Sequence, residues 1–257
     1  MRIRASYLLL HIIGVITFFW PFVFSRSSAT FLQFGDGLWL SLTISVIAGA
    51  LLIRHVSNQL LDSKIIAIIG ILTAVVSSLR LLGAGAVGIE PIWFILLLSA
   101  RALGPEIGMS LAVVSLSASA LVTGGVGPWL SYQILAAAWI AYGVRFIPSR
   151  LRERAEIIAL AGYGIVASLI FGALMDLQLW PWLTGIDTQL SFIDGASIAA
   201  NAGRFILFHF ATSMAWDIPR AVLTSTLILL TGRAVLVTLR RTMTRLNVRA
   251  MEQAAPV

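Results

Sequence analysis

Two ionisable residues, Asp217 and Arg220, lie within an apolar stretch in the C-terminal quarter of the chain. A spacing of three residues puts both on one face of a helix, where a carboxylate and a guanidinium can pair. Ionisable groups inside a membrane-spanning helix are costly and usually face a partner or a cavity. The pair is therefore either an ion pair that locks helices together or a participant in substrate handling, and the sequence leaves both open.

A glycine- and proline-rich turn, Thr-Gly-Gly-Val-Gly-Pro-Trp (123–129), joins two long apolar stretches. Gly adopts unusual backbone angles, Pro fixes one, and Trp prefers the membrane interface. Tyr132 and Gln133 follow, which places polar groups at the start of the next apolar stretch. We predict an ordered, tightly bent segment at a membrane surface.

Further polar and aromatic residues lie in the outer halves of the predicted spans or in the loops outside the membrane. The orientation of the spans that this requires is derived below. Aromatic residues at that level ordinarily form an interfacial belt. Ligand sites, in contrast, combine apolar and aromatic walls with a few placed polar groups. Both interpretations apply to this set, which comprises Glu90, Trp93, Trp129, Tyr132, Gln133, Asp176, Trp180, Trp182, Asn201 and His209.

Small residues recur at helical spacing in two apolar stretches. One series is Gly70, Ala74 and Ser78, with Ala67 adjoining, and the other is Gly164, Ser168 and Gly172. Small residues four positions apart let another helix approach closely. Each series serves either packing inside the chain or contact with another subunit.

Motifs for ATP hydrolysis, zinc binding and serine-based hydrolysis do not occur. The sequence has no Gly-x-x-x-x-Gly-Lys-Ser/Thr, His-Glu-x-x-His or Gly-x-Ser-x-Gly pattern. His11, His55 and His209 are dispersed, and the absence of cysteine excludes disulfides and thiolate ligands. We predict that the chain is not an enzyme, has no catalytic residue and holds no metal or cofactor of its own.

The composition is that of a polytopic helical membrane protein. Hydrophobic residues make up 59% of the 257, charged residues 11%, and the mean hydropathy is +0.95, unlike a soluble domain. Apolar stretches near the ~20 residues that cross a bilayer recur, and backbone groups in lipid require them to be helical. We predict an all-α chain with eight spans, the fourth of them short: 6–24, 36–54, 64–83, 89–103, 106–123, 129–147, 157–177 and 204–232.

Basic residues divide unequally between the two sides of these spans. With the N-terminus in the cytoplasm, fourteen of the 18 Lys and Arg fall on the cytoplasmic side and Arg220 falls within a span. Only Arg26, Arg80 and Arg204 fall outside. This is the positive-inside distribution, and it predicts a plasma-membrane protein with both termini cytoplasmic. The high pI, near 11.0, is thus explained by basic residues placed for membrane topology. We therefore expect the lipid bilayer as a partner and no nucleic acid.

Three parts follow from this pattern. Residues 1–60 form an N-terminal extension with two spans, 61–235 form a six-span core, and 236–257 form a basic cytoplasmic tail that we expect to contact anionic lipid or a partner. The first span contains bulky aromatic residues and no small-residue cleavage site, so we interpret it as retained. The long outer loop 178–203 has the length to fold back as a lid.

Four segments of the core resemble one known family. They are Gly-Ile-Glu-Pro-Ile-Trp (88–93), Ser-Ala-Arg-Ala-Leu-Gly-Pro-Glu-Ile-Gly (99–108), Thr-Gly-Gly-Val-Gly-Pro-Trp-Leu-Ser-Tyr-Gln (123–133) and Ala-Trp-Asp-Ile-Pro-Arg-Ala (215–221). The chain resembles substrate-binding S components of energy-coupling factor (ECF) vitamin transporters, in the form found in high-GC Gram-positive bacteria. The resemblance covers roughly residues 60–235, and the two leading spans depart from the six-helix pattern.

The resemblance implies a protein that captures a vitamin or vitamin precursor, of cobalamin or thiamine type, from outside. It implies as partners a transmembrane T component and two ATP-binding subunits, which use the ATP. The first core helix would meet the T component through Ala67, Gly70, Ala74 and Ser78. The ligand would lie in an outward-facing pocket formed by Glu90, Trp93, Trp129, Tyr132, Gln133, Asn201 and His209.

Two other classes remain open. A stand-alone secondary transporter or channel would need coupling groups near the membrane midplane, and Asp217 with Arg220 is the candidate pair. An intramembrane enzyme is the third possibility, for which the sequence offers no nucleophile.

Overall fold

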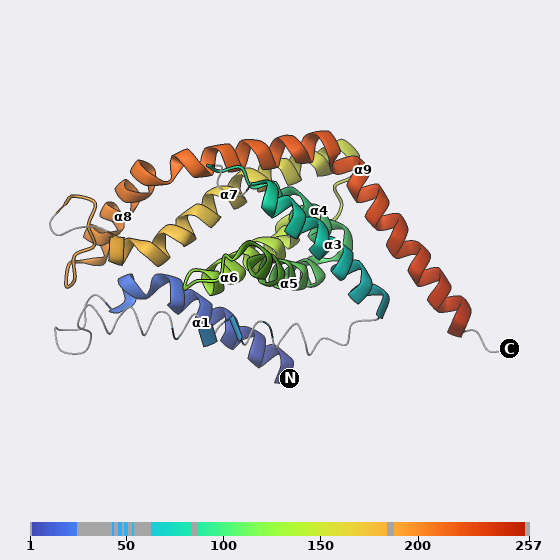
Figure 1. The fold of residues 1–257 in the computed structure, drawn as a ribbon, viewed down its shortest axis with the longest axis horizontal. Coiled ribbons are helices and arrows are strands. Elements are labelled where there is room, and N and C mark those ends of the chain that lie inside the picture. The colour runs from blue at the N-terminus through green and yellow to red at the C-terminus, as the bar shows by residue number, and fades with distance from the viewer. Residues whose placement is uncertain are drawn as a thin grey trace.

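The structure is a computed structural model that describes residues 2–24, 63–83, 87–183 and 188–254. It also describes positions 43, 46, 47, 49, 50 and 53. All regular elements in these residues are helices, so the all-α class expected from the sequence is confirmed (Figure 1). They are α1 (Arg2–Phe24), α3 (Ser63–Leu82), α4 (Ile92–Leu103), α5 (Pro105–Thr123), α6 (Leu130–Gly143), the 3-10 turn η1 (Val144–Phe146), α7 (Glu153–Leu183), α8 (Ile198–Thr212) and α9 (Met214–Ala254). Most of the predicted second span, 36–54, lies outside the described residues, and its six described positions are helical.

Four of the described helices are long and apolar enough to cross a membrane. They cover Ser63–Leu82, Pro105–Thr123, Glu153–Pro181 and Met214–Arg245. Shorter apolar helices cover His11–Phe22 and Ile92–Leu103, and the latter corresponds to the fourth predicted span. The chain is therefore a membrane-embedded helical protein with several spans.

The last predicted span, 204–232, is wrong as a single helix. The chain breaks at Ser213, which ends α8 and precedes the 41-residue helix α9. Helix α9 then continues to Ala254 without interruption at residue 235, and its C-terminal part projects from the bundle (Figure 1). Helix α7 likewise extends to Leu183, so Trp180 and Pro181 belong to a helix. Of the predicted loop 178–203, the described residues outside a helix are 188–197, because α8 begins at Ile198.

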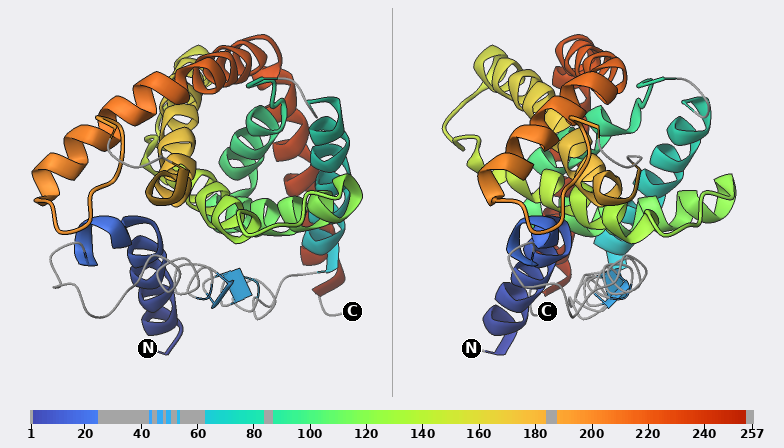
Figure 2. Two further views of the ribbon diagram at one scale, coloured as in Figure 1. Left: turned by 60° about the vertical axis from the view of Figure 1, so that its left-hand side comes forward. Right: turned by 90° about the vertical axis from the view of Figure 1, so that its left-hand side faces the viewer.

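Helices α7 and α9 pack side by side in opposite directions and form one wall of the bundle (Figures 1 and 2). Near the start of α7 the carboxylate of Glu156 binds Arg240 of α9, and at the middle of α7 the carbonyl of Ser168 accepts from Arg220 near the start of α9. Helix α4 packs against α9 and α5, and α5 packs against α3 and α6. Leu96, Leu97, Leu98, Leu111, Leu160 and Ile228 are almost completely buried in the resulting core.

The N-terminal helix α1 packs against this core (Figure 2). Trp139 of α6 donates its indole N–H to Nδ1 of His11 at 3.0 Å. The ring of Phe18 meets the edge of Tyr132 with centroids 5.4 Å apart. The predicted extension 1–60 therefore begins with a helix that is part of the bundle.

The two series of small residues have different surroundings. A Cβ at Gly164 would contact Thr224 and Ile228, and a Cβ at Gly172 would collide with Asp217, so the α7 series faces α9. On α3, in contrast, Ala67, Gly70, Ala74 and Ser78 are all exposed, and nothing lies within 4 Å of a Cβ built at Gly70. The buried residues of α3, Ile69, Leu72 and Val76, occupy the opposite face.

Candidate functional site

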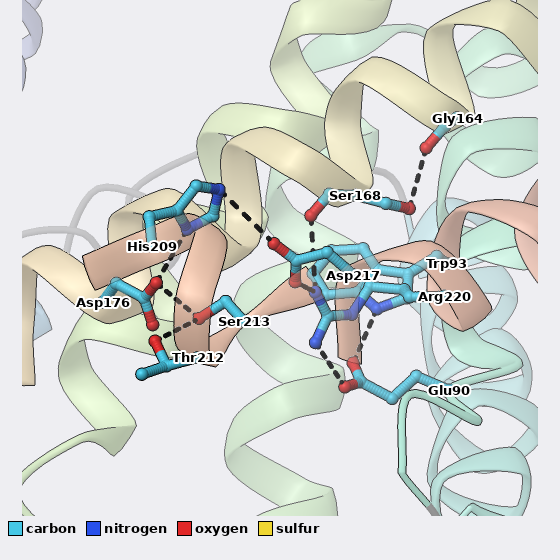
Figure 3. A network of polar contacts seen from close by, with 10 residues as sticks. All are labelled: Glu90, Trp93, Gly164, Ser168, Asp176, His209, Thr212, Ser213, Asp217 and Arg220. Carbon is cyan, nitrogen blue, oxygen red and sulfur yellow. Dashed lines mark hydrogen bonds and ion pairs between the residues drawn. The ribbon is translucent and has the colours of Figure 1, made fainter. Parts of the chain in front are cut away.

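Charged and polar side chains gather where α7, α8, the start of α9 and the loop before α4 meet (Figure 3). We call this group the Asp217 cluster. Its members come from segments up to 130 residues apart, so only the folded chain brings them together. They are Glu90, Trp93, Asp176, His209, Ser213, Asp217 and Arg220.

Arg220 lies at the centre of the cluster and pairs with two carboxylates. Its Nη1 lies 2.6 Å from Oδ1 of Asp217, and its Nη2 lies 2.9 Å from Oε1 of Glu90. Arg220 also donates to the carbonyl of Ser168 at 3.3 Å and lies over the ring of Phe171, 5.0 Å from its centroid. Asp217 is 1% exposed and Arg220 is 5% exposed, and burial of charges at this depth requires such pairing.

The break at Ser213 sets the position of Asp217. The backbone N–H of Asp217 donates to the carbonyl of Ser213 at 2.9 Å, which starts α9 and puts the carboxylate in its first turn. A carboxylate there interacts favourably with the positive end of the helix dipole. Arg220 follows three residues later on the same face, as the spacing in the sequence predicts.

The loop before α4 approaches the backbone of α9 closely, and this brings Glu90 to Arg220. Gly88 has a φ of 65°, and a Cβ at this position would lie 2.3 Å from the carbonyl oxygen of Trp216. Only glycine fits such a contact in this conformation. Two residues later, Oε2 of Glu90 accepts the indole N–H of Trp93 at 2.8 Å, while Oε1 binds Arg220.

His209 stands between two further carboxylates of the cluster. Its Nδ1 lies 2.7 Å from Oδ2 of Asp176, and its Nε2 lies 3.8 Å from Oδ2 of Asp217. The hydroxyl of Ser213 also donates to Oδ2 of Asp176. The imidazole therefore connects the carboxylate of α7 with the carboxylate of α9.

Two buried atoms of the cluster have no hydrogen-bond partner among the described residues. They are Oδ2 of Asp217 and Nε of Arg220. The Asp217 carboxylate lies directly against Gly172, where a Cβ would come within 1.9 Å of Oδ2. Leaving a buried polar atom unpaired costs about 1–3 kcal/mol, so the arrangement is either unfavourable or completed by a ligand.

A cavity of about 470 Å³ adjoins these atoms. Its volume lies within the range of small-molecule sites, roughly 300–1,000 Å³. Charged, polar and aromatic side chains from α7, α8 and α9 meet in it. It is lined by Gly172, Met175, Asp176, Phe208, Thr212, Ser213, Trp216, Asp217 and Arg220.

The structure brings some of the predicted pocket residues together and separates others. Glu90, Trp93 and His209 belong to the Asp217 cluster. Gln133 accepts a hydrogen bond from Arg80 at 3.0 Å, and Arg80 lies close enough to Glu90 for electrostatic interaction. Gln133 is thus linked to the cluster without lining the cavity.

Three other predicted pocket residues have different surroundings. Tyr132 is 1% exposed and packs against Phe18. Asn201 is fully buried and brackets the backbone of Ile193, accepting from its N–H at 3.1 Å and donating to its carbonyl at 2.9 Å. Trp129 is 43% exposed. None of the three lines the cavity.

Several lining residues were not singled out from the sequence. Thr212 and Ser213 lie at the break between α8 and α9, and Phe208 precedes it by about one helical turn. A serine followed by an acidic residue in the first turn is a signal for a helix start, and Ser213 with Asp217 fits it. This signal would have divided the predicted span and pointed to the cavity.

A second charged group lies near the start of α7, where α9 passes it at Arg240. Oε1 of Glu156 binds Nε of Arg101 at 2.6 Å and Nη2 of Arg240 at 2.7 Å, and Oε2 binds Nη1 of Arg240 at 3.0 Å. Arg101 donates its remaining groups to the carbonyls of Ile147 and Pro148. We call Glu156, Arg101 and Arg240 the Glu156 cluster, in which one carboxylate binds both arginines.

Comparison with protein-family models, curated proteins and solved structures finds no match to this chain. The chemistry of the site is therefore inferred from its geometry. Within the described residues, no three His, Cys, Asp or Glu side chains are placed to hold a metal ion. The arrangement is suited to binding a small molecule through charge and hydrogen bonds.

Proposed function

We propose that this chain is the membrane-embedded substrate-binding subunit of an ATP-driven importer of the ECF type, which captures a vitamin or vitamin precursor from outside. The observation that carries the proposal is the cavity of about 470 Å³ beside the Asp217 cluster. The positive-inside distribution of the sequence supports an outward orientation of that end of the bundle. A capture site for an imported molecule belongs on that face.

The positions of the family-like segments support the proposal. Segment 88–93 supplies Glu90 and Trp93 to the Asp217 cluster, and segment 215–221 supplies Asp217 and Arg220. These segments are remote in sequence, yet an ion pair of 2.9 Å joins them. Two of the four family-like segments therefore meet at the candidate site.

The exposed series of small residues on α3 supports a partner in the membrane. Ala67, Gly70, Ala74 and Ser78 remain uncovered, whereas the comparable series on α7 is covered by α9. Small residues let a second helix pack closely in lipid. We propose that a transmembrane T component covers this face of α3 and connects the chain to two ATP-binding subunits.

Purification of the tagged chain from cells that contain its natural partners tests this function. We expect a transmembrane subunit and two ATP-binding subunits to copurify in fixed proportion and to be identified by mass spectrometry. Gly70→Leu is expected to abolish copurification, and Val75→Leu, a similarly exposed change beside the series, is expected to preserve it. Equal recovery of the partners with both variants would contradict docking through this face.

A secondary transporter is the second candidate, because buried ionisable residues in a span favour it. Asp217, Arg220 and His209 lie in contact at the start of α9 and the end of α8. In that case uptake by proteoliposomes containing this chain alone would follow an ion gradient. The proposed importer instead requires ATP and its partners, so the two energy sources distinguish the candidates.

A further inference from the structure

Two carboxylates, Asp176 and Asp217, line the cavity beside the Asp217 cluster, each with one oxygen that accepts no hydrogen bond from the described residues. Both contacts of Asp176, from His209 and from Ser213, fall on Oδ2, which leaves Oδ1 without a partner among the described residues. Oδ2 of Asp217 also accepts no hydrogen bond, in a side chain that is 1% exposed, and Nε2 of His209 lies 3.8 Å from it. Two carboxylate oxygens are therefore available to a ligand, and Nε of Arg220 is a buried donor without a hydrogen bond. The indole N–H of Trp216 is a further donor in the lining, on a side chain that is 46% exposed.

The positive charge at the cavity is already matched by carboxylates. Arg220 is the arginine that lines the cavity, and it pairs with both Asp217 and Glu90. Glu90 also lies near Arg80, so it adds little free negative charge. His209 contributes at most one positive charge and lies between Asp176 and Asp217. The lining itself carries two carboxylates and one guanidinium, which leaves a negative balance when His209 is neutral.

The remaining walls favour an organic molecule. Phe208, Trp216 and Met175 line the cavity together with the carboxylates. An aromatic face attracts a cation when the positive group lies within about 6 Å of the ring. The described residues hold no set of ligands for a metal ion, and about 470 Å³ accommodates a molecule with a ring.

We propose that the cavity binds an organic cation, with an amidinium, ammonium or protonated ring nitrogen held by Oδ2 of Asp217 and Oδ1 of Asp176. The apolar part of the ligand packs against Phe208 and Trp216. This proposal rests on the proposed function, because it names the charge class of the molecule that the subunit captures. Because Gly172 has no side chain, the Asp217 carboxylate can lie directly against α7 at this position.

Three probes of nearly equal shape test the charge preference. Benzamidine is a cation at neutral pH, benzamide is neutral and benzoate is an anion. Equilibrium dialysis is carried out with the full chain in nanodiscs of phosphatidylcholine, which carries no net charge and adds no anionic surface. We expect saturable binding of benzamidine, with a Kd at least about ten-fold lower than that of benzamide, as for a charge-assisted hydrogen bond. We expect no saturable binding of benzoate.

Substitutions locate the binding of benzamidine. Asp217→Asn and Asp176→Asn are each expected to raise its Kd about ten-fold or more, through loss of one charged partner. Asp176 is the more exposed of the two, at 15% against 1%, so this variant tests the site even when Asp217→Asn fails to fold. Glu106→Gln, an exposed carboxylate at the start of α5, is the control and is expected to leave the Kd unchanged.

Several results would overturn the proposal. They are absence of saturable benzamidine binding, preference for benzoate, equal binding of the three probes, and a Kd that neither Asp variant changes. Copurification of the ATP-binding subunits is an independent result. A chain that copurifies with them yet prefers benzoate keeps the proposed function and loses the cation site. A chain that prefers benzamidine but has no ATP-binding partner keeps the cation site and loses the importer function.

Discussion

Two charged clusters join α7 to α9, one near the start of α7 and one near the start of α9, and they differ in how fully their polar atoms are paired. In the Glu156 cluster both carboxylate oxygens bind arginine, and Arg101 places its other donors on backbone carbonyls. In the Asp217 cluster one oxygen each of Asp217 and Asp176 and one guanidinium nitrogen of Arg220 have no hydrogen bond from the described residues, and a cavity adjoins them. Glu156 and Asp176 are 20 residues apart on α7, about 30 Å along a helix, which matches the hydrocarbon thickness.

The difference separates a structural role from a binding role. An unpaired buried polar atom costs about 1–3 kcal/mol, so charges that only hold helices together are best fully paired, as around Glu156. We infer that the Glu156 cluster fastens α4, α7 and α9 to each other. In the Asp217 cluster, we infer that a bound ligand supplies the hydrogen bonds that these carboxylate and guanidinium atoms lack.

The largest expected effect follows from Glu156→Gln. This change leaves Arg101, whose side chain is 10% exposed, without its carboxylate. Breaking a buried pair by removing one partner costs about 3–5 kcal/mol, and Arg240, which is 41% exposed, adds little because solvent screens it. Chemical denaturation in detergent should show this loss. Glu153→Gln, an exposed change in the same turn, should leave stability unchanged, and equal stability of the two variants would contradict a structural role for Glu156.

The next effect concerns the pair in the Asp217 cluster. Arg220→Gln leaves two carboxylates, Asp217 and Glu90, without their partner, and we expect a loss of about 3 kcal/mol. Asp217→Asn should cost less, because Arg220 keeps Glu90. The double variant should recover part of the loss of Arg220→Gln. Additive losses in the same denaturation measurements would show that the two residues do not act as a pair.

A smaller effect on stability but a clear one on binding is expected for Gly172→Ala. The added Cβ would meet the Asp217 carboxylate and displace it from the cavity. The Kd for benzamidine should rise about ten-fold, as for loss of the carboxylate partner. Gly162→Ala is the matched control on α7, since nothing lies within 4 Å of its Cβ. It should leave binding unchanged and raise stability by up to about 1 kcal/mol through helix propensity.

The smallest effect is expected for Gln133→Ala. Its side-chain oxygen binds Arg80 and does not line the cavity. Substitutions away from a site change free energies by about 0.5 kcal/mol, so the Kd for benzamidine should shift by about two-fold at most. A ten-fold rise of this Kd in equilibrium dialysis would contradict this account and would indicate that the ligand binds near the turn at 123–129.

The sequence predicts the helices and one charged pair because both depend on neighbours along the chain. Apolar length marks the spans, and the spacing of Asp217 and Arg220 puts them on one helical face. The prediction of one span over 204–232 overlooks the break at Ser213, because apolar residues continue on both sides of it. The approach of Glu90 depends on Gly88 packing against Trp216, and Asp176 meets His209 through the packing of α7 against α8. Such contacts between remote segments leave no periodic signal in a single sequence.

One measurement tests the central claim, that the cavity beside the Asp217 cluster is the ligand site, most directly. Crystals of the chain with 4-bromobenzamidine give a bromine anomalous peak that locates the ligand independently of any substitution. We predict a peak between α7, α8 and α9, with the amidinium against Oδ2 of Asp217. A peak beside Trp129 and Gln133, with the cavity free of ligand density, would contradict the claim.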